Sequence, residues 1–547
     1  MRITLSDVVD GAILAEYPGS SDLEANRAAV SAARALKARQ KLPARGTRGL
    51  LDAIPGARTL LLLFDSDLLD RVSLSREVAM GAAGFPSAGE GRTVRIPVFY
   101  GGAAGADLPD LARGLGVEPS EFARRHAAAR YTVAFVGFAP GFPYLVGLPP
   151  ELHAPRLASP RTLVPAGSVA IGGEYTGIYP SGTPGGWRLI GRAPVRLFDP
   201  SASPPCLLLP GDRVAFEEVS EAEFSRLDSE REKGESETAR EGDPLFRVLS
   251  PGLWTSVQGG PRFGWGSYGV PPGGAMDLEA LAAGNITLEN PPHAAALEIT
   301  LAGPELVALS PAAISLSGAE ISCEINGAPA VARDVHEIAP GDRLRSGHAR
   351  SGARAYLCVR GGLETPVHPA PSRRLVAGDL VWSAERNEIA AEKAPSPAFA
   401  DSYSEALAKE EATAGRPSPG GRGSGPLRVV LGPQDFSEEA IATFLQGTYR
   451  VSPASDRRGI RLEGPTISHR GSAEIPPEGT TLGAIQVPSG GLPIALGPDR
   501  PVTGGYAKIA TVIGSDWARL AQVLPGSVVR FRAVEMAEAV AAREEGE

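Results

Sequence analysis

The sequence predicts a mainly β protein with smaller α+β parts. Gly (66) and Pro (50) make up about a fifth of the 547 residues, against roughly 12% in average proteins. This density indicates many tight turns, which are typical of β-rich folds. In addition, a turn followed by alternating apolar positions recurs at residues 209–214, 339–344, 377–381 and 524–529. Such a phrase suits the start of a closing strand in a barrel or sandwich, so repeated β units are expected.

The first 95 residues show the pattern of a small α/β domain. Ser21 and Glu24 have capping-box spacing, and the Ala-rich run behind them to Arg39 lacks Gly and Pro. These features predict a helix. The apolar run Thr59–Phe64 predicts a buried strand.

From residue 96 onward the pattern changes to strands and short helices. Strands are expected at 96–100 and 131–138, and two short helices at 107–115 and 119–126. Two short helices joined by a Gly can resemble a DNA-binding helix-turn-helix motif. The net negative charge of the chain instead favours helices that only pack against the rest of the domain.

Two stretches have linker composition and divide the chain. Residues 217–243 carry charges of both signs with almost no large apolar residue, which predicts solvated coil or an exposed helix. Residues 394–426 are rich in Pro, Ser and Gly, and their flanks exclude a phosphate-binding loop. We therefore predict six segments: 1–95 (α/β domain), 96–218 (barrel), 219–243 (linker), 244–393 (first lobe), 394–426 (linker) and 427–547 (second β lobe with a C-terminal helix).

Composition excludes several classes of function. The net charge of −9, spread without a basic block, speaks against a nucleic-acid partner. Three distant cysteines favour buried reduced thiols over disulfides or a zinc site, and we expect no metal site. Neither a membrane-spanning run nor a signal-peptide pattern is visible, which predicts a cytoplasmic protein without a membrane partner.

Well-known catalytic signatures are also missing from the sequence. It contains no GxxxxGK[ST], HExxH or GxSxG motif, no Ser-Ser-Lys arrangement and no Ala-Met-Lys-Met biotin attachment site. ATP or biotin, if used, is therefore expected to reside on a partner or in a site of another kind.

A dense group of motifs in residues 135–192 suggests a small-molecule pocket lined by loops. It comprises Phe135-Val-Gly-Phe-Ala-Pro-Gly-Phe-Pro-Tyr144, Pro160-Arg161, Val164-Pro-Ala-Gly-Ser-Val-Ala-Ile171, Gly177-Ile-Tyr-Pro-Ser181 and Pro184-Gly-Gly-Trp-Arg-Leu-Ile-Gly-Arg192. Gly and Pro fix turns, while Arg, Tyr, Ser and Trp supply a cation, hydroxyls and an aromatic wall. The alternative is a barrel in which Gly serves tight turns and Trp187 is core.

These motifs, in this order, resemble the B subunit of the bacterial ATP-dependent 5-oxoprolinase over residues 1–220. That family is also known as kinase A inhibitor or allophanate hydrolase subunit 1. Residues 245–533 are similar to the C subunit of 5-oxoprolinase (allophanate hydrolase subunit 2). This second resemblance depends on Val257-Gln258, Arg262, Gly269-Val-Pro-Pro-Gly-Gly-Ala-Met-Asp277, Asn285, Leu297-Glu298, Arg428-Val-Val-Leu-Gly-Pro-Gln434, Ser455-Asp-Arg-Arg-Gly-Ile-Arg461, Gly483-Ala-Ile-Gln-Val-Pro488 and Thr503-Gly-Gly-Tyr506.

The resemblance implies a natural B–C fusion, similar also to the carboxyltransferase region of urea carboxylase. It implies cyclophilin-like β-barrels behind the small N-terminal α/β domain, and a component of an ATP-dependent 5-oxoprolinase that cleaves 5-oxoproline to glutamate. Such an enzyme acts with a separate protein like the 5-oxoprolinase A subunit, without which this chain is expected to be inactive. ATP and Mg then belong to the complex, the substrate is a small amide or lactam, and a homo-oligomer is left open.

By resemblance, two sets of residues are candidates for the site. The catalytic candidates are His126, Glu298 and Gln486, and for His126 a structural role is the favoured alternative. Arg457 is equally compatible with an ion pair to Asp456 or Glu463. The substrate-binding candidates are Arg161, Tyr179, Ser181, Gln258, Arg262, Asp277, Asn285, Arg457 and Tyr506.

Two other functions stay open at this stage. A carboxyltransferase component of a urea carboxylase-like enzyme would accept a carboxyl group from a biotinylated carrier. A non-catalytic regulator would bind a histidine kinase.

The chain departs from the C-subunit pattern at several presumed pocket loops. Gly259 replaces an Asp, Glu289 replaces a Gly, Pro477 replaces a Ser, and residues 370–374 differ from the usual GSRST. Loss of a carboxylate removes a base or a salt-bridge partner for Arg262. The substrate can therefore differ from 5-oxoproline, or the C half can have shifted toward a structural role.

Overall fold

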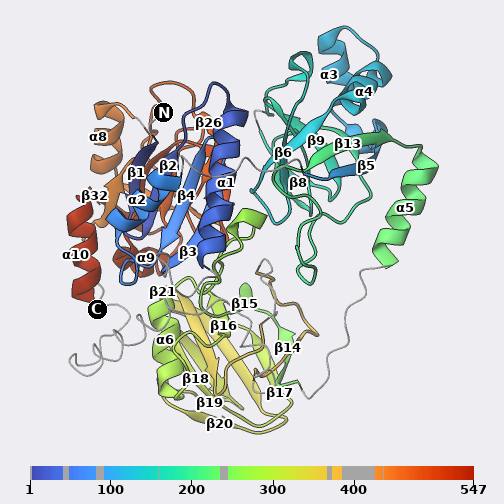
Figure 1. Ribbon diagram of the computed structural model, residues 1–547. Helices are drawn as coiled ribbons and strands as arrows, with labels where there is room; N and C mark the ends of the chain where they lie inside the picture. Colours follow the sequence, from blue (N-terminus) through green and yellow to red (C-terminus); the bar gives the residue numbers. More distant parts are fainter. Residues whose placement is uncertain are drawn as a thin grey trace.

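The computed structural model describes residues 3–40, 49–81, 91–157, 159–233, 244–365, 372–384, 425–434 and 436–546. These residues form a small N-terminal domain, a barrel and two further β lobes (Figure 1). The predicted boundaries at 95, 218, 243, 393 and 426 remain predictions. Most of the second linker, 394–426, lies outside the described residues.

The N-terminal domain is an antiparallel sheet of four strands in the order β1-β2-β4-β3, covered by two helices. Glu24 N contacts Ser21 Oγ at 3.3 Å, and Ser20 Oγ donates to Glu24 Oε2 at 2.6 Å, which confirms the predicted helix start. Leu36 and Leu60 are buried between helix and sheet. The elements are β1 Thr4–Val9, β2 Ala12–Glu16, α1 Asp22–Gln40, β3 Leu50–Pro55, β4 Thr59–Phe64 and α2 Arg71–Gly81.

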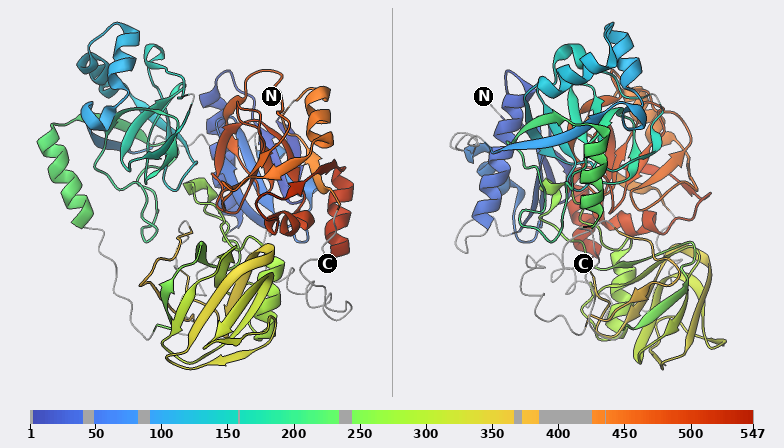
Figure 2. Two further views of the ribbon diagram at one scale, coloured as in Figure 1. Left: turned by 180° about the vertical axis from the view of Figure 1, so that it is seen from behind. Right: turned by 90° about the vertical axis from the view of Figure 1, so that its right-hand side faces the viewer.

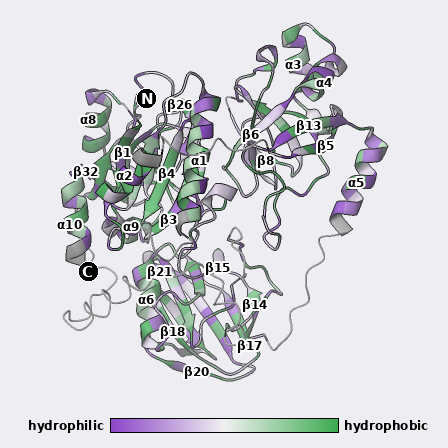
Figure 3. Ribbon diagram, in the orientation of Figure 1, coloured by the Kyte–Doolittle hydropathy of each residue, from purple (hydrophilic) through white to green (hydrophobic). Residues whose placement is uncertain are grey.

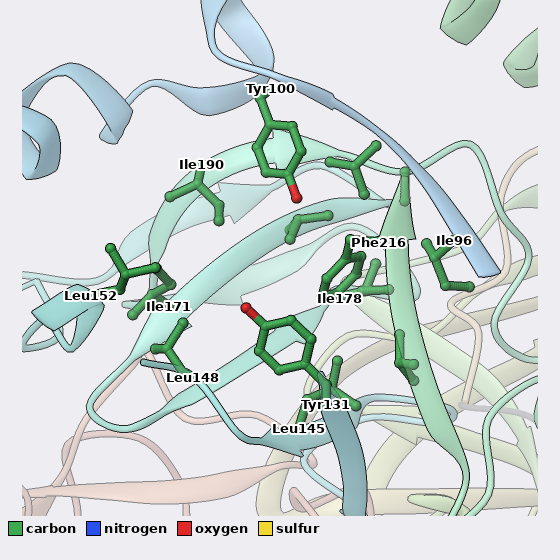
Figure 4. Packing of buried hydrophobic residues seen from close by; sticks show 14 of the residues in the cluster. Ile96, Tyr100, Tyr131, Leu145, Leu148, Leu152, Ile171, Ile178, Ile190 and Phe216 are labelled. Carbon is green, nitrogen blue, oxygen red and sulfur yellow. The ribbon is translucent and has the colours of Figure 1, made fainter. Parts of the chain in front are cut away.

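The next domain is a closed barrel of seven strands in the order β10-β7-β6-β13-β5-β12-β9. Its interior holds branched aliphatic and aromatic side chains, among them Ile96, Ile171 and Phe216, which interdigitate (Figure 4). The strands are β5 Thr93–Tyr100, β6 Tyr131–Val136, β7 Pro143–Val146, β9 Ser168–Gly172, β10 Tyr175–Ile178, β12 Arg188–Arg192 and β13 Arg213–Glu218.

Short helices and a ribbon decorate this barrel. β8 and β11 pair only with each other and form a two-stranded ribbon outside the ring. Helix α5 (Glu221–Lys233) exposes most of its described residues to solvent, as the charged composition of this stretch predicts. The other elements are η1 Gly102–Gly105, α3 Leu108–Leu115, α4 Pro119–Ala128, η2 Pro150–Leu152, β8 Arg161–Val164 and β11 Thr183–Gly185.

The first lobe of the C half is built on a nine-stranded sheet in which two long antiparallel strands, β18 and β21, form the centre. Helix α6 packs on these two strands. The elements are β14 Phe246–Ser250, β15 Trp254–Gln258, η3 Gly266–Tyr268, α6 Leu278–Thr287, β16 Ala296–Thr300, β17 Glu305–Ala308, β18 Ala312–Ile325, β19 Ala328–Pro329, β20 His336–Ile338, β21 Arg343–Val359 and β22 Leu380–Val381.

The second lobe of the C half is an eight-stranded sheet with a separate β26–β29 ribbon and three helices. Its core is lined by Phe444, Tyr449 and Ile485. The elements are β23 Leu427–Leu431, α8 Glu438–Gln446, β24 Tyr449–Val451, β25 Gly459–Glu463, β26 Glu474–Gly479, β27 Ala484–Gln486, β28 Ile494–Leu496, β29 Thr503–Tyr506, β30 Lys508–Val512, α9 Gly514–Ala521, β31 Val528–Val529, β32 Phe531–Ala533 and α10 Met536–Gly546.

The N-terminal domain lies side by side with the second C-half lobe, although they are the two ends of the sequence (Figure 2). Leu14, Leu61 and Leu63 of the first pack with Val502 of the second in one buried cluster. Arg543 of α10 donates to Asp67 Oδ2 at 2.6 Å. The first and last parts of the chain therefore share a common core.

The fold class predicted from the sequence is confirmed, because the structure is mostly β around a closed barrel with an α/β N-terminal part. All four recurrent turn phrases lead into strands, at β13, β21, β22 and β31. Strand β4 is hydrophobic, whereas α5 is largely hydrophilic (Figure 3). Cys206, Cys323 and Cys358 are buried and free, as expected. None of the described helices combines the length and apolar character needed to cross a membrane.

Candidate functional site

The barrel meets the second C-half lobe through a contact that only glycine permits. Phe138 N donates to Thr503 Oγ1 at 2.9 Å, and Thr503 is completely buried. A Cβ atom on Gly137 would lie 2.0 Å from the same hydroxyl oxygen. The Phe-Val-Gly-Phe motif therefore serves the seam between the two halves, by which we mean the surface where B-half and C-half residues meet.

A loop of the C half, residues 264–269, closes the seam further along. Asp52 of β3 accepts hydrogen bonds from Gly264 N at 3.1 Å and Gly266 N at 2.7 Å, and it also pairs with Lys37 at 3.1 Å. On the barrel side, Gly141 N donates to Tyr268 O at 2.9 Å. One loop thus ties the C half to both domains of the B half.

Tyr179 belongs to a buried aromatic cluster on the side of the barrel that faces the seam. Its ring lies 6.2 Å from Phe138 and 5.2 Å from Phe142, centroid to centroid, in edge-on geometry. Burial raises the pKa of Tyr179 to about 12, so its hydroxyl stays protonated. Trp187 is part of the same cluster. The motif-rich segment therefore supplies core, and one edge of that core reaches the seam.

Arg161 and Ser181, the other B-half candidates, lie on or beside the β8–β11 ribbon. Arg161 Nη2 pairs with Asp107 Oδ1 at 2.8 Å, and Leu189 N donates to the other Asp107 oxygen at 2.6 Å. Ser181 is exposed in the turn before β11. Arg161 thus anchors the ribbon to the barrel, and its predicted contact with substrate stays a prediction.

His126 is fully enclosed in the barrel core. Its Nδ1 lies 2.8 Å from Tyr100 Oη and its Nε2 3.0 Å from Thr176 Oγ1. Because the Thr176 hydroxyl donates to Ala170 O at 3.0 Å, Nε2 carries the proton and Nδ1 accepts from Tyr100. Burial lowers the pKa of His126 to about 3. Both nitrogens are occupied within the core, which supports the structural alternative for this residue.

The buried neutral His126 predicts a pH dependence of stability. Its ordinary pKa of 6.5 falls to about 3 on folding, so below pH 6.5 the unfolded chain binds more protons than the folded one. Stability is therefore full above pH 6.5 and falls as the pH drops toward 3, by about 2 kcal/mol between pH 6.5 and pH 5. Urea denaturation at both pH values should show this loss, and His126→Gln should flatten it. An unchanged slope in the variant would contradict the assignment.

The C-half candidates Gln258, Glu298 and Arg457 form one buried network. The Arg457 guanidinium donates to Glu298 Oε1 at 2.5 Å, to Asp499 Oδ2 at 2.8 Å, to Gly274 O at 2.6 Å and to Gln258 Oε1 at 3.2 Å. Although burial lowers the pKa of Arg457, the Glu298 and Asp499 carboxylates raise it above its ordinary value overall. Arg457 therefore pairs with Glu298 and Asp499, and not with the alternative partners Asp456 and Glu463.

This network joins the two C-half lobes. Glu298 and Gln258 lie on β16 and β15 of the first lobe, whereas Arg457 precedes β25 of the second. The second oxygen of Glu298 accepts from Met276 N at 2.7 Å and from Tyr356 Oη at 2.8 Å. A carboxylate with all these donors is held rigidly at the lobe junction.

Asp277 continues the same junction. One oxygen caps α6 by accepting from Ala280 N at 2.9 Å, and the other accepts from Gln522 Nε2 of the second lobe at 2.8 Å. Asn285, at the end of α6, donates to Pro292 O at 3.1 Å and Ala294 O at 2.8 Å and therefore shapes the following loop. The geometry shows framework contacts for both residues, and their predicted substrate contacts remain untested.

Arg262 and Tyr506 belong to different lobes of the C half. Burial lowers the pKa of Arg262, and the nearby Asp499 opposes this effect. Tyr506 ends β29 and is paired with Glu474 of β26. Because Thr503 on the same strand contacts the barrel, Tyr506 belongs to the ribbon that meets the seam, whereas Arg262 lies nearer the Arg457 network.

Gln486 belongs to a buried polar cluster beside the seam. A Cβ on Gly504 would lie 2.4 Å from Gln486 Nε2, and Gly504 follows Thr503 in β29. Opposite Gln486 on β30 is Lys508, which is 2% exposed and pairs with Glu478. Gln434 Nε2 donates to Glu478 Oε1 at 2.7 Å. Among the described residues, Gln486 Nε2 has no hydrogen-bond acceptor. Lys508 Nζ has no acceptor there beyond its ion pair with Glu478.

Sequence reasoning did not single out Lys508 or Arg156 for the site. A lysine within a largely apolar strand, Lys508–Val512, was the available signal for a buried charge. Arg156 lies between the barrel and the β26–β29 ribbon. Its Nε is 3.9 Å from Glu474 Oε2, and a Cβ on Gly505 would lie 3.1 Å from its Nη2. Its side chain is only 21% exposed.

The structure shows the local surroundings of the departures from the C-subunit pattern. Glu289 has a φ of 61°, a left-handed conformation in which glycine is the favoured residue. A Cβ on Gly259 would lie 3.1 Å from His293 O, so the backbone is close there. Pro477 O accepts from Ala57 N at 2.7 Å across the seam. The first two positions of residues 370–374 lie outside the described residues, whereas Ser372 donates to Asp499 Oδ1 at 3.1 Å.

At the seam, a partly open cavity of about 240 Å³ lies between the N-terminal sheet and the second C-half lobe. Glu16, Arg58 and Thr59 line it from one half, and Gln434 and Glu478 from the other. Arg161, Tyr179 and Asn285 do not line it. The N-terminal domain and the second C-half lobe therefore form this cavity, and the barrel loops do not contribute to it. Within the described ranges, no three His, Cys, Asp or Glu side chains are grouped as metal ligands.

The fold and its paired halves define a protein built from carboxyltransferase-type domains. Residues 268–533 match the family described as carboxyltransferase domain, subdomain A and B, and residues 3–208 match carboxyltransferase domain, subdomain C and D. The solved structure of the protein TTHA0988 superposes with a TM-score of 0.75 and 33% identity over 95% of this chain and 99% of that one.

The curated relatives match either the B half or the C half of the chain. The chain is 38% identical to the 5-oxoprolinase B subunit of Haemophilus influenzae, over 38% of this chain and 94% of that protein. It is 30% identical to the 5-oxoprolinase C subunit of the same organism, over 55% of this chain and 96% of that protein. The chain therefore belongs to the family of the 5-oxoprolinase B and C subunits, joined here in one polypeptide.

Proposed function

We propose that this chain is a component of an ATP-dependent 5-oxoprolinase that acts with a separate protein like the 5-oxoprolinase A subunit. One observation carries the proposal: nearly the full lengths of both a B subunit and a C subunit are matched within this single chain, whose halves share a seam. The proposal includes a cytoplasmic location.

Opening a lactam with ATP requires activation of the carbonyl oxygen, addition of water and donors that stabilise the developing oxyanion. Buried donors beside the seam, Gln486 and Lys508, have hydrogen-bonding capacity that no described acceptor uses. We assign the reacting amide to this region. Catalytic roles for Glu298 and Gln486 remain part of the proposal, whereas the geometry of His126 favours a framework role.

The charges at the seam do not fit a nucleoside triphosphate. Three of its cations each have an acidic partner: Arg58 with Asp22, Arg156 with Glu474, and Lys508 with Glu478. A triphosphate requires surplus positive charge or a metal ion. ATP and Mg are therefore assigned to the complex with the A-type partner.

Reconstitution tests the proposed function. The chain is mixed with its A-type partner, 5-oxoproline and ATP-Mg, and glutamate and ADP are measured. We expect both products in equal amounts, and neither when the chain or the partner is omitted. Absence of product from the complete mixture, beside an active 5-oxoprolinase as positive control, contradicts the proposal.

A second candidate is a carboxyltransferase component. It is favoured by the two domain descriptions and by 29% identity to urea amidolyase of Lachancea kluyveri, which covers 52% of this chain but 17% of that protein. This candidate predicts that the chain retains a biotinylated carrier protein in a pull-down and transfers its carboxyl group, with no release of glutamate.

A further inference from the structure

The seam cavity has the size of a small metabolite. At about 240 Å³, it holds about eight water-sized groups, given a share of roughly 30 Å³ for each. Its walls come from both halves of the chain: β1, β2 and β4 on one side, and β26 with the loop after β23 on the other. A molecule in this cavity would contact both halves at once.

Glu478 offers an acceptor to such a molecule. The residue is only 6% exposed, and it lines the cavity. Lys508 and Gln434 both contact Oε1. These contacts hold the carboxylate in place and leave Oε2 for an N–H or ammonium group of the ligand.

Arg58, in the opposite wall, offers donors. Its Nη1 pairs with Asp22 Oδ1 at 2.5 Å, and its side chain is 28% exposed. A guanidinium has five N–H donors in a planar fork, so donors remain for a carboxylate. Thr59, next to it, is 7% exposed, and its Oγ1 has no hydrogen-bond partner among the described residues. The hydroxyl oxygen itself is buried, so Thr59 completes this wall without offering an exposed hydroxyl.

The charges around the cavity select the ligand further. Among the described residues, Glu16, Asp22 and Glu478 outnumber Arg58 and Lys508, which leaves one net negative charge. Like charges repel strongly in a partly buried site, so phosphates and other polyanions are disfavoured. A molecule with an N–H or ammonium group for Glu478 and a carboxylate for Arg58 matches both walls.

We propose that the seam cavity binds a small amino-acid-like molecule, with Glu478 Oε2 accepting from its nitrogen and Arg58 binding its carboxylate. Only the choice of probes rests on the proposed function. 5-Oxo-L-proline and L-glutamate both carry these groups, one as a lactam N–H and the other as an ammonium.

Calorimetric titration of the full chain tests the proposal with 5-oxo-L-proline, L-glutamate and ATP as separate probes. One of the first two should bind, and ATP without metal should not. Arg58→Gln should weaken binding at least tenfold. The matched control is Arg95→Gln, because Arg95 is also paired with a carboxylate, Glu217, but is largely exposed on the barrel strand β5; its affinity should equal that of the wild type.

A second variant keeps the test independent of the Arg58 ion pair. Ser6→Phe should fill the cavity from β1 without removing a charge, and should abolish binding. Binding of neither amino-acid probe to the folded chain overturns the proposal, as does wild-type affinity in both Arg58→Gln and Ser6→Phe. Failure of the reconstitution with retained probe binding would contradict the proposed function alone.

Discussion

Arg457→Ala is expected to destabilise the C half by about 3–5 kcal/mol, the cost of leaving a buried carboxylate without its partner. Glu298 has no exposed side-chain surface, and Arg457 is 4% exposed. Removal of the guanidinium also leaves Gln258 Oε1 and Gly274 O without this donor. Equilibrium urea denaturation of wild type and variant, followed by far-UV circular dichroism, measures the difference.

The neighbouring arginine provides a matched control for this experiment. Arg458 is exposed, and Arg458→Ala should change the unfolding free energy by less than about 0.5 kcal/mol. Double substitution of Arg457 and Glu298 by Met and Leu should recover part of the loss, since a buried ion pair can be replaced by packed apolar groups. Equal stability of Arg457→Ala and Arg458→Ala would show that the network does not hold the lobes.

Local sequence patterns were sufficient for much of the fold. The capping residues Ser21 and Glu24 predict the start of α1, and the apolar run Thr59–Phe64 coincides with β4. These signals work because backbone capping and burial of a continuous apolar strand depend on residues close in sequence. The turn phrases succeed for the same reason, since each turn and its strand are contiguous.

The partners of the candidate residues could not be predicted in this way. Arg457 bonds Glu298 across 159 positions of sequence and Gln258 across 199. No periodicity specifies such a pairing, and the neighbouring acids Asp456 and Glu463 were equally compatible with the sequence. The resemblance brought these residues together as candidates, and the fold shows why: they tie one lobe to the other.

The seam shows the same limit. Lys508 occupies a strand whose other residues are apolar or small, so its burial is visible in the sequence, but its partner Glu478 lies on the separate β26–β29 ribbon. The cavity is lined by the N-terminal domain and the C-terminal lobe, which only the folded chain brings together. The sequence instead suggested a pocket lined by the loops of residues 135–192, and none of these residues lines the seam cavity.

Gly137→Ala is expected to separate the barrel from the second C-half lobe. Its Cβ would lie 2.0 Å from Thr503 Oγ1, 2.6 Å from Cγ2 and 2.8 Å from Cβ, which are distances that packed atoms do not adopt. Thr503 is completely buried, so it has no free space into which to move. The barrel must shift, and the Phe138–Thr503 hydrogen bond is lost.

Limited proteolysis and small-angle scattering should detect this change. We expect faster cleavage near the seam and a larger radius of gyration in Gly137→Ala, together with at least a tenfold loss of product in the reconstituted reaction. Gly114→Ala is the control, because Gly114 lies in α3 with no atom within 4 Å of its added Cβ. Adding Thr503→Ala to Gly137→Ala removes the two closest clashing atoms and should restore part of the compact state. If Gly137→Ala alone matches the wild type in both measurements, the close approach of the halves at Gly137 does not hold the seam, and activity need not depend on it.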